Sequence, residues 1–411
     1  MTVRICFLIL IWADLAYDLT MRALQAKRKK LPLPENVADI YEPDAYASWR
    51  EYSAEKSKLG AVEKIFDALV LTALFASPAF SLLYSRLPGG EVSKSLLLLV
   101  LFTALTSVLT LPFDWIRVMW IEAKYGFSKS SAKTFLGDEL KDFILNAVLN
   151  AALFLFTYYM YRAFGSRFFW FVYAGAALFV LVFSMLATSF QRLYNKFTVL
   201  EDGELRNTLT GLFKTSGYEL ENIYVMDASR RTTKVNAFCS GLGRFKKIVL
   251  YDNLVNRYTP REITAVFSHE LGHYKRRDTL KNTVYTLFLM GVVTAVIAWF
   301  AATPALSTAY GFEEMSIVFG VIALQAVFLP PLFTLLMIPR AAMARRFEYK
   351  ADAEAAKLGY GEELISALKK LSRDNFSDLN PHPAVVLIEY DHPTVGQRID
   401  AIRKREAEHD L

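Results

Sequence analysis

Cysteine is scarce in this sequence of 411 residues, and the two that occur stand far apart. Cys6 lies in an apolar run near the N-terminus, whereas Cys239 lies in the second half of the chain. Two isolated cysteines argue against a disulfide framework of the kind that stabilises small secreted domains. They also argue against a zinc site built on cysteine, so a metal site would have to use other side chains.

A strong excess of charge of one sign is also lacking. The 47 basic and 41 acidic side chains leave a net charge of +6, which is too small to indicate nucleic-acid binding. The sequence contains no RNA- or DNA-binding motif, no internal repeat and no low-complexity linker. We therefore expect no nucleic-acid partner, and we interpret the basic clusters, which lie beside apolar segments, as signals of membrane topology.

Apolar residues are abundant: they make up 54% of the chain and occur in long runs. Seven runs approach the ~20 residues that a helix needs to cross a bilayer, namely 3–19, 65–83, 96–112, 143–161, 168–190, 283–302 and 315–338. The first is the weakest, because it carries Arg4, Asp14 and Asp18. A cleaved signal peptide is the alternative there, but no clear cleavage site follows, so we favour a retained span.

Basic residues predict the orientation of these spans. They follow the first, third and last spans, at Arg22, Lys27, Arg28, Lys29 and Lys30, at Arg117, Lys124, Lys129 and Lys133, and at Arg340, Arg345 and Arg346. The loop 302–314 has no lysine or arginine. The positive-inside rule then places the N-terminus outside and the C-terminus in the cytoplasm. The membrane would be the bacterial inner membrane or that of the endoplasmic reticulum.

Two soluble portions alternate with the spans. We expect four segments: 1–190 with five spans, 191–282 as the first soluble portion, 283–338 with two spans, and 339–411 as a second, largely helical soluble portion. The first portion contains an amphipathic pattern at 205–214 and β-like runs at 222–226 and 247–251, with an extended stretch at 236–238 between them. The expected fold is mostly α, with a small β-sheet.

Polar residues also occur inside the spans, at Asp67, Asn146, Asn150 and Gln325. They have two interpretations. One is hydrogen bonding between neighbouring helices. The other is a water-filled space enclosed by the spans, since a polar group that faces lipid is costly.

The first soluble portion contains the pattern H-E-x-x-H. His269 and His273 are four residues apart, so a helix places both imidazoles on one face, where they can bind one Zn²⁺ with Glu270 beside it as a proton acceptor. Thr259 and Glu262 form a T-x-x-E capping box that predicts where this helix begins. A chance occurrence is the competing interpretation, although the chain has only five histidines.

A third zinc ligand is expected from a carboxylate, because catalytic zinc sites of this kind use two histidines and one acid. Glu348 and Asp352 follow the last span and are four residues apart. On a helix, Glu348 could bind the metal while Asp352 accepts the second ring N–H of a ligating histidine. Taken alone, the two carboxylates are better interpreted as a solvated surface pair.

The chain resembles the type 1 CAAX prenyl proteases, integral-membrane zinc endopeptidases that process prenylated proteins such as yeast a-factor and prelamin A. The resemblance extends over nearly the whole chain. It rests on H-E-L-G-H followed by two spans and R-R-F-E-Y-K-A-D (345–352), and on V-N-A-F (235–238), K-K-I-V-L-Y-D (246–252), N-P-H-P (380–383), D-H-P-T (391–394) and Q-R-I (397–399).

This resemblance implies a ring of seven helices around a large hydrophilic chamber, joined to a gluzincin-like zinc protease domain. It implies one Zn²⁺ per chain, bound by His269, His273 and Glu348, with Glu270 as the catalytic glutamate. It further implies an edge strand that pairs with an extended peptide at Asn236, Ala237 and Phe238, and two groups near the scissile bond or the metal-binding carboxylate, His392 and Arg398.

Two positions depart from the family pattern. Asp391 stands where serine is common, and Cys239-Ser240 replaces a more aromatic stretch. Both bear on substrate preference, so a quality-control protease that cleaves misfolded, non-prenylated membrane proteins stays as an alternative. Two other classes remain to be weighed: a transporter, which gives Glu270 no role, and a scaffold with a structural zinc, which predicts intact function without Glu270.

Overall fold

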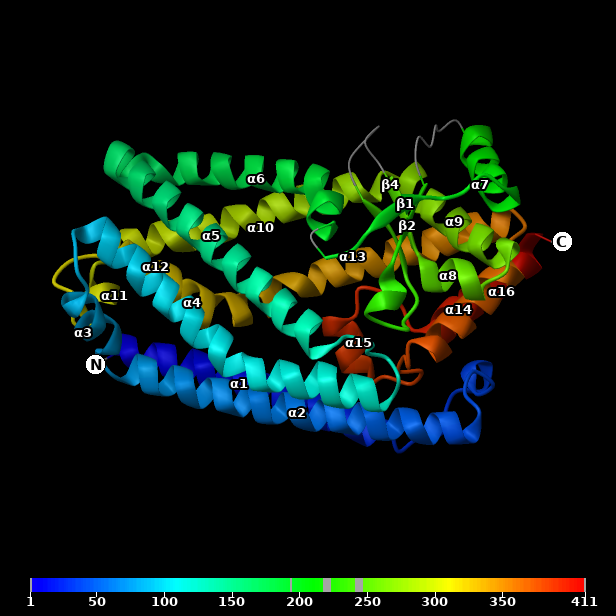
Figure 1. Cartoon of the computed structure of the whole chain (residues 1–411), viewed down its shortest axis with the longest axis horizontal. Coiled ribbons are helices and arrows are strands. Elements are labelled where there is room, and N and C mark those ends of the chain that lie inside the picture. Colours follow the sequence, from blue (N-terminus) through cyan, green and yellow to red (C-terminus); the bar gives the residue numbers. More distant parts are fainter. Residues whose placement is uncertain (1, 193, 217–222, 241–246, 410–411) are drawn as a thin grey trace.

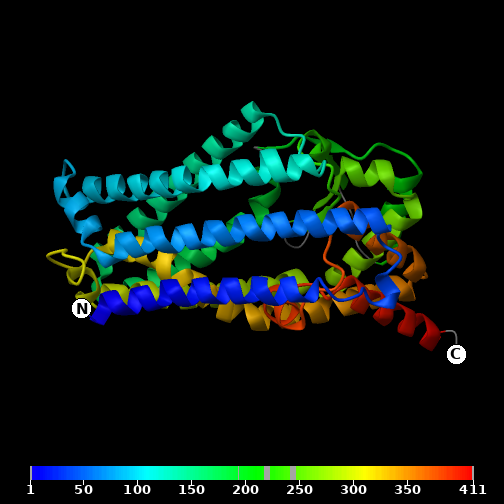
Figure 2. The ribbon, with the colours of Figure 1, turned by 90° about the horizontal axis from the view of Figure 1, so that it is seen from below.

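Long helices run along the longest axis of the molecule and end in a smaller mixed portion at one end (Figure 1). The computed structural model describes residues 2–192, 194–216, 223–240 and 247–409. Its long helices are α1 (Thr2–Arg28), α2 (Pro43–Ala76), α4 (Glu91–Trp115), α5 (Ala132–Phe164), α6 (Phe168–Gln191), α10 (Asp278–Ala301) and α13 (Leu329–Lys357). The N-terminus lies at the end opposite to the C-terminus (Figures 1 and 2).

Four helical stretches of the described residues are long and apolar enough to cross a membrane: Glu91–Glu122, Ala132–Val182, Asp278–Ala301 and Ile317–Lys357. The second contains α5 and the described part of α6, which Figure 1 draws as two helices diverging from a short turn, η3 (Gly165–Arg167). Helix α2 and the short α3 (Ala79–Arg86), bent by 66° at their junction, form a fifth candidate. The protein is therefore an integral membrane protein that crosses the bilayer several times.

Helix α1 is not among these candidate spans, and its charges explain why. Phe7, Ile11 and Leu15 are buried in the helical core, but Asp14 and Asp18 lie on the same helix. The carboxylate of Asp14 is paired with Lys64 of α2 at 2.6 Å, so the charge on α1 faces a partner helix and not lipid. Likewise, Gln325 donates a hydrogen bond to Asn150 of α5 at 2.8 Å, which supports the helix-to-helix interpretation for that pair.

A four-stranded sheet lies in the smaller mixed portion. Its order is β1-β2-β4-β3, with strands β1 (Phe197–Val199), β2 (Ile223–Met226), β3 (Ala237–Ser240) and β4 (Lys247–Tyr251). Strands β2 and β4 are parallel, and β1 and β3 pair antiparallel at the two edges. The predicted β-like runs are thus confirmed. Strand β1 was not predicted, because three residues are too few for a periodic pattern to be recognised.

Helix α9 (Pro260–Lys275), which carries the H-E-x-x-H pattern, packs against α13 and against two shorter helices of this portion. A shared apolar core joins Ile263, Phe267 and Leu271 of α9 to the sheet and to α7 (Glu204–Thr215), the predicted amphipathic helix. The other helices of this portion are α8 (Asp252–Arg257), α14 (Gly361–Asp374), α15 (Pro383–Glu389) and α16 (Val395–His409). Nine of the sixteen residues of α9 are buried, so packing fixes the orientation of its histidine face.

Both parts of the mixed portion continue directly into candidate spans. Helix α10 begins three residues after α9 ends. The last candidate span runs through α12 (Ile317–Ala323) and a π-helical turn, η6 (Leu324–Phe328), into α13 without a break, and α13 continues to Lys357. The segment boundary expected at 338/339 thus falls inside one helix, and Glu348 is rigidly attached to the membrane part.

Candidate functional site

The start of α9 is fixed by the predicted capping box, which the structure confirms. Thr259 Oγ1 accepts a hydrogen bond from the backbone N–H of Glu262, and Glu262 Oε2 accepts one from the N–H of Thr259. Burial alone would raise the pKa of Glu262, but hydrogen bonds from Lys370, Ser366 and the Thr259 backbone lower it below its usual range. The ionised Glu262 therefore holds α9 against α14 through Lys370.

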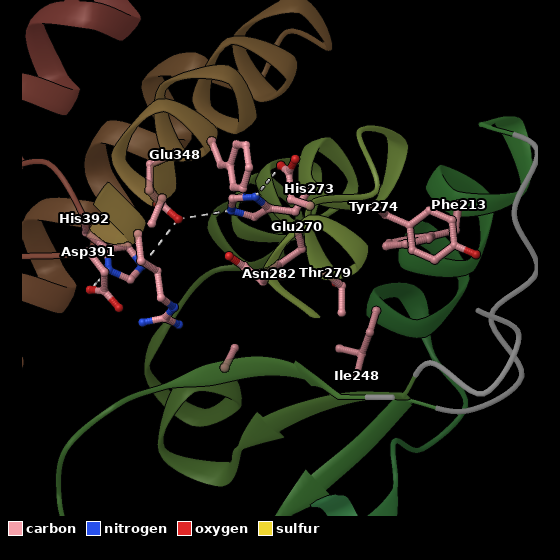
Figure 3. A pocket seen from close by; sticks show the side chains of 15 residues that line it. Phe213, Ile248, Glu270, His273, Tyr274, Thr279, Asn282, Glu348, Asp391 and His392 are labelled. Carbon is pink, nitrogen blue, oxygen red and sulfur yellow. Dashed lines mark hydrogen bonds and ion pairs between the residues drawn. The ribbon is translucent and has the colours of Figure 1, made fainter. Parts of the chain in front are cut away.

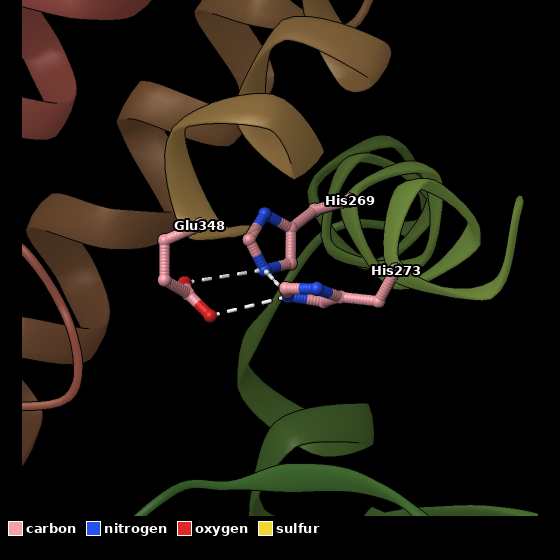
Figure 4. Close-up of side chains that lie close together, drawn as sticks. All are labelled: His269, His273 and Glu348. Carbon is pink, nitrogen blue, oxygen red and sulfur yellow. Dashed lines mark hydrogen bonds and ion pairs between the residues drawn. The ribbon is translucent and has the colours of Figure 1, made fainter. Parts of the chain in front are cut away.

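His269, His273 and Glu348 direct their ligand atoms to one point (Figure 4). The two Nε2 atoms are 3.2 Å apart, and Glu348 Oε1 and Oε2 lie 3.1 Å from His273 Nε2 and 3.5 Å from His269 Nε2. Tetrahedral zinc with bonds of ~2.0–2.1 Å separates its ligand atoms by about 3.3 Å, so these spacings fit a zinc ion. Glu348 Oε2 is also buried, and no described residue donates a hydrogen bond to it, as expected of an oxygen that binds a cation.

Two further carboxylates determine which imidazole nitrogens are protonated. His269 Nδ1 is 2.8 Å from Asp352 Oδ1, and His273 Nδ1 is 3.2 Å from Asp278 Oδ2. Because an ionised carboxylate can only accept, each Nδ1 donates its hydrogen, and each Nε2 presents a lone pair to the shared point. Two unprotonated Nε2 atoms 3.2 Å apart would repel each other unless a proton or a metal ion lies between them.

Asp278 was not identified from the sequence. It lies in the first turn of α10, directly after Arg277, whose left-handed conformation (φ 56°) turns the chain back towards His273. No periodic pattern signals such a turn at a non-glycine residue. The charges around His273 also favour a cation: burial would lower its pKa, but Glu348, Glu270 and Asp278 raise it to about 9.

Arg398 lies behind the ligands, not in the cavity. The guanidinium group is buried and donates to both carboxylate oxygens of Asp352, at 2.9 and 2.6 Å. Its Nη1 is 3.4 Å from Glu348 Oε2. Of the two roles that the resemblance left open for Arg398, this geometry favours the second, positioning of the metal-binding carboxylate.

A cavity of about 290 Å³ opens on the other side of the three ligand residues (Figure 3). Its lining includes Glu270, His273, Glu348, His392 and Ala237. His392 Nε2 is 3.4 Å from Glu348 Oε1, while its Nδ1 donates to Asp391 Oδ1 at 2.7 Å. The hydrogen bond to Asp391 raises the pKa of His392. The cavity thus combines a proton acceptor, Glu270, with a hydrogen-bond donor, His392.

The edge strand β3 forms one wall of this cavity. Ala237 begins the strand and lines the cavity, and β3 pairs only with β4 among the described strands. Asn236 is exposed just before the strand, and its Oδ1 accepts a hydrogen bond from the N–H of Ala237. The backbone of Phe238 belongs to β3, but its side chain lies outside the described part of the chain.

Gly272, inside H-E-L-G-H, allows α9 and α13 to approach closely enough for Glu348 to reach the histidines. A Cβ at this position would lie 2.7 Å from the Cα of Ala351 and 3.1 Å from the Cβ of Glu354. Both are closer than ordinary van der Waals contacts, and the Cα of Ala351 cannot rotate away. The site therefore depends on the absence of a side chain here.

We expect Gly272→Ala to push the two helices apart, to weaken metal binding and to destabilise the fold by about 1–3 kcal/mol. Thermal unfolding with zinc competition against a chromophoric chelator measures both effects. Gly211→Ala is the matched control, because Gly211 lies in helix α7 with open space around it and its replacement should be neutral or mildly stabilising. Equal behaviour of the two variants would contradict the close-approach argument.

Comparisons with known proteins agree with this geometry. Residues 21–196 match the family model described as CAAX prenyl protease N-terminal, five membrane helices, and residues 199–406 match that of peptidase family M48. The chain is 29% identical to CAAX prenyl protease 1 of Saccharomyces cerevisiae, over 93% of this chain and 91% of the yeast protein. It is 27% identical to the CAAX prenyl protease 1 homolog of Oryza sativa, over 97% and 96%.

A solved structure also has a fold similar to that of this chain. The crystal structure of S. mikatae Ste24p has a TM-score of 0.88 at 25% identity and covers 98% of this chain and 99% of the Ste24p chain. Both halves of the chain therefore match one kind of protein, in which membrane helices and a metalloprotease domain form a single unit. The chain belongs to peptidase family M48, as an integral-membrane zinc metalloprotease of the CAAX prenyl protease type.

Proposed function

We propose that this protease cleaves CAAX-type prenylated peptides or proteins at a single zinc ion held by His269, His273 and Glu348. The observation that carries the proposal is the convergence of their ligand atoms, with Glu348 Oε2 buried and accepting no hydrogen bond from the described part of the chain. The names of the curated relatives supply the substrate class. The lipid bilayer is the second partner, because a prenylated substrate is itself held at the membrane.

When held by His269, His273 and Glu348, a zinc ion would supply a Lewis acid that polarises a substrate carbonyl and lowers the pKa of a water molecule towards ~7. Glu270 accepts a proton from the attacking water as its oxygen bonds to the carbonyl carbon. The carbon–nitrogen bond then breaks, and Glu270 delivers that proton to the leaving nitrogen. His392 acts as an imidazolium, since the hydrogen bond from its Nδ1 to Asp391 raises its pKa. Its Nε2–H then donates to the negative charge that develops on the carbonyl oxygen.

The other residues hold these groups in place. Asp352 and Asp278 fix the tautomers of the two histidines, and Arg398 fixes Asp352. An extended substrate would pair with the free edge of β3, where Asn236, Ala237 and Phe238 offer backbone groups. Backbone pairing tolerates varied side chains, which suits a protease with more than one substrate.

We further propose that seven helices cross the membrane around a hydrophilic chamber, with α1 as a retained span and the gluzincin-like domain in the cytoplasm. In support, the N-terminus and the loop without basic residues lie at the same end: Arg4 donates a hydrogen bond to the Ala309 carbonyl at 2.7 Å. The opposite end carries the sheet, α9 and α16 (Figure 1). Segments 1–190, 191–282, 283–338 and 339–411 would then alternate between membrane and cytoplasm.

Substrate class is tested with a farnesylated CAAX peptide and its unmodified twin, both with purified full-length protein in lipid nanodiscs. We expect the farnesylated peptide to be cleaved at least tenfold more efficiently, since burying even two CH₂ groups contributes about 0.8 kcal/mol each. Glu270→Gln serves as the blank for both peptides. Equal cleavage of the farnesylated and the unmodified peptide would favour the alternative, a quality-control protease for non-prenylated membrane proteins. The names of the relatives do not favour that alternative.

A further inference from the structure

Arg340 stands in the substrate cavity without a directly paired carboxylate among the described residues. It lies on α13 and lines the same cavity as Glu348 and His392. Within the described ranges no carboxylate is within ion-pair distance of its guanidinium group, and its one hydrogen-bonding contact is the sulfur of Met337 at 3.8 Å. The charge of Arg340 is felt by Asp391, whose pKa it lowers, but no carboxylate meets the half-buried guanidinium directly. Its desolvation cost is therefore only partly compensated.

Other arginines near the site have their partners. Arg398 donates to both oxygens of Asp352, and Arg345 donates to three backbone carbonyls at the end of α15 and beyond it. The acidic groups of the cavity are also engaged: Asp391 accepts from His392, and Asp278 is bound to His273 and Lys281. Arg340 is therefore free to bind an anion that enters the cavity.

A second unmet group lies on the facing helix. Asn282 of α10 lines the cavity, and its Oδ1 is buried without a hydrogen-bond partner among the described residues. The backbone N–H of a bound peptide would satisfy this oxygen. The cavity thus presents an acceptor, Asn282 Oδ1, and a cation, Arg340. Together they suit the end of a peptide chain, which offers a backbone N–H and a carboxylate.

The position of Arg340 sets the length of that peptide. Arg340 precedes Glu348 by eight residues, so their Cα atoms lie about 12 Å apart along the helix axis. Three residues of extended peptide span about 10 Å. Because α13 leads from the membrane to the zinc ligands, Arg340 lies on the membrane side of Glu348.

We propose that Arg340 binds the C-terminal carboxylate of the substrate, about three residues beyond the bond that is cleaved. This inference rests on the proposed function and deepens it. The short C-terminal tail of the substrate then points towards the membrane part of the cavity. The rest of the substrate stays outside the cavity. A guanidinium group can bind a carboxylate through two parallel hydrogen bonds, which favours a free chain end over an amide.

The test compares three farnesylated peptides of one sequence, each ending three residues past the cysteine. One has a free C-terminal carboxylate, the second a carboxamide, and the third a carboxamide with glutamate as its last residue. With the wild-type protein we expect the free acid to exceed the carboxamide by about 10- to 100-fold in kcat/KM, the range for a hydrogen bond to a charged group. The difference should lie mainly in KM, because the contact is remote from the reacting bond.

Arg340→Gln should lower cleavage of the free acid to the carboxamide level and leave the carboxamide unchanged, while Arg340→Lys should keep part of the preference. Arg346→Gln is the matched control: it removes the same charge from the same helix, but Arg346 is exposed and does not line the cavity. Zinc content and thermal unfolding of each variant verify that the site is intact.

Three results would overturn the assignment. Equal cleavage of acid and amide by the wild type would remove the carboxylate site, as would an equal loss on both peptides in Arg340→Gln. A glutamate-bearing carboxamide that matches the free acid would assign Arg340 to an acidic side chain instead. No cleavage of any peptide by zinc-loaded wild type would instead overturn the proposed function itself, and this inference with it.

Discussion

Replacing Glu270 by glutamine should lower the rate of peptide cleavage by about 10²- to 10⁴-fold, the range for loss of a general base, with zinc still bound. Glutamine keeps the size of the side chain but cannot accept the proton of the attacking water. Zinc binding should persist because Glu270 is not among the groups that converge on the metal point. Metal analysis and peptide cleavage, measured on the same purified sample, check both statements.

Glu363→Gln is the matched control for Glu270→Gln. Glu363 of α14 pairs with the exposed Arg261 and does not line the cavity, and such surface pairs contribute at most about 1 kcal/mol. Full activity in Glu270→Gln would contradict the mechanism and would leave only a structural role for the zinc. Loss of zinc together with activity would show that Glu270 holds the metal, contrary to the geometry.

The H-E-x-x-H half of the site was accessible from sequence because it is local. His269 and His273 share one helix, and the capping box at Thr259 marks where that helix begins. Four-residue spacing then fixes their relation without reference to the rest of the fold. The same reasoning found the amphipathic helix α7 and the longer strands β2 and β4.

The other half required information that spacing does not contain. Glu348 is 75 residues beyond His273 in the numbering, and only the resemblance to a family raised it above a surface carboxylate. What brings it to the histidines is the contact of Gly272 with Ala351, a packing relation between two helices. Asp278 was missed for a similar reason, because its approach depends on the backbone turn at Arg277.

The number of spans shows a different limit. The sequence predicts seven, whereas hydropathy along the described helices supports four, or five with the bent α2–α3 pair. The charges of α1 cause part of the difference: its Asp14 is neutralised by Lys64 of α2, a pairing that a single-sequence hydropathy test cannot count. Charge in a span is thus compatible with burial when the partner lies on the next helix.

The continuity of α13 links the membrane part to the chemistry. One unbroken helix carries part of the last candidate span, then Arg340, then Glu348 and Asp352. Any change in how α13 packs against α9 would therefore move the third ligand and the proposed carboxylate site together. This arrangement gives a physical reason why the protease and its membrane helices form one unit.

Replacing Glu348 by glutamine should remove zinc and cleavage together. Glutamine has nearly the same shape, but the neutral amide is a poor zinc ligand and takes away the charge that favours a cation between the two Nε2 atoms. We expect zinc content near zero after dialysis and cleavage at least about 10³-fold below wild type, since both metal functions are lost. Metal analysis of the dialysed protein measures the first, and the peptide assay measures the second.

Asp352→Asn distinguishes a residue that binds the metal from one that only holds a metal ligand in place. Asp352 contacts His269 and Arg398 but not the metal point, so its amide should weaken zinc affinity by about 10- to 100-fold without abolishing it, and excess zinc should restore cleavage. Glu348→Gln should not recover under the same conditions, because the ligand itself is gone. Wild-type zinc content in Glu348→Gln would remove Glu348 from the ligand set, and recovery of both variants to the same extent would reduce Glu348 to the supporting role assigned to Asp352.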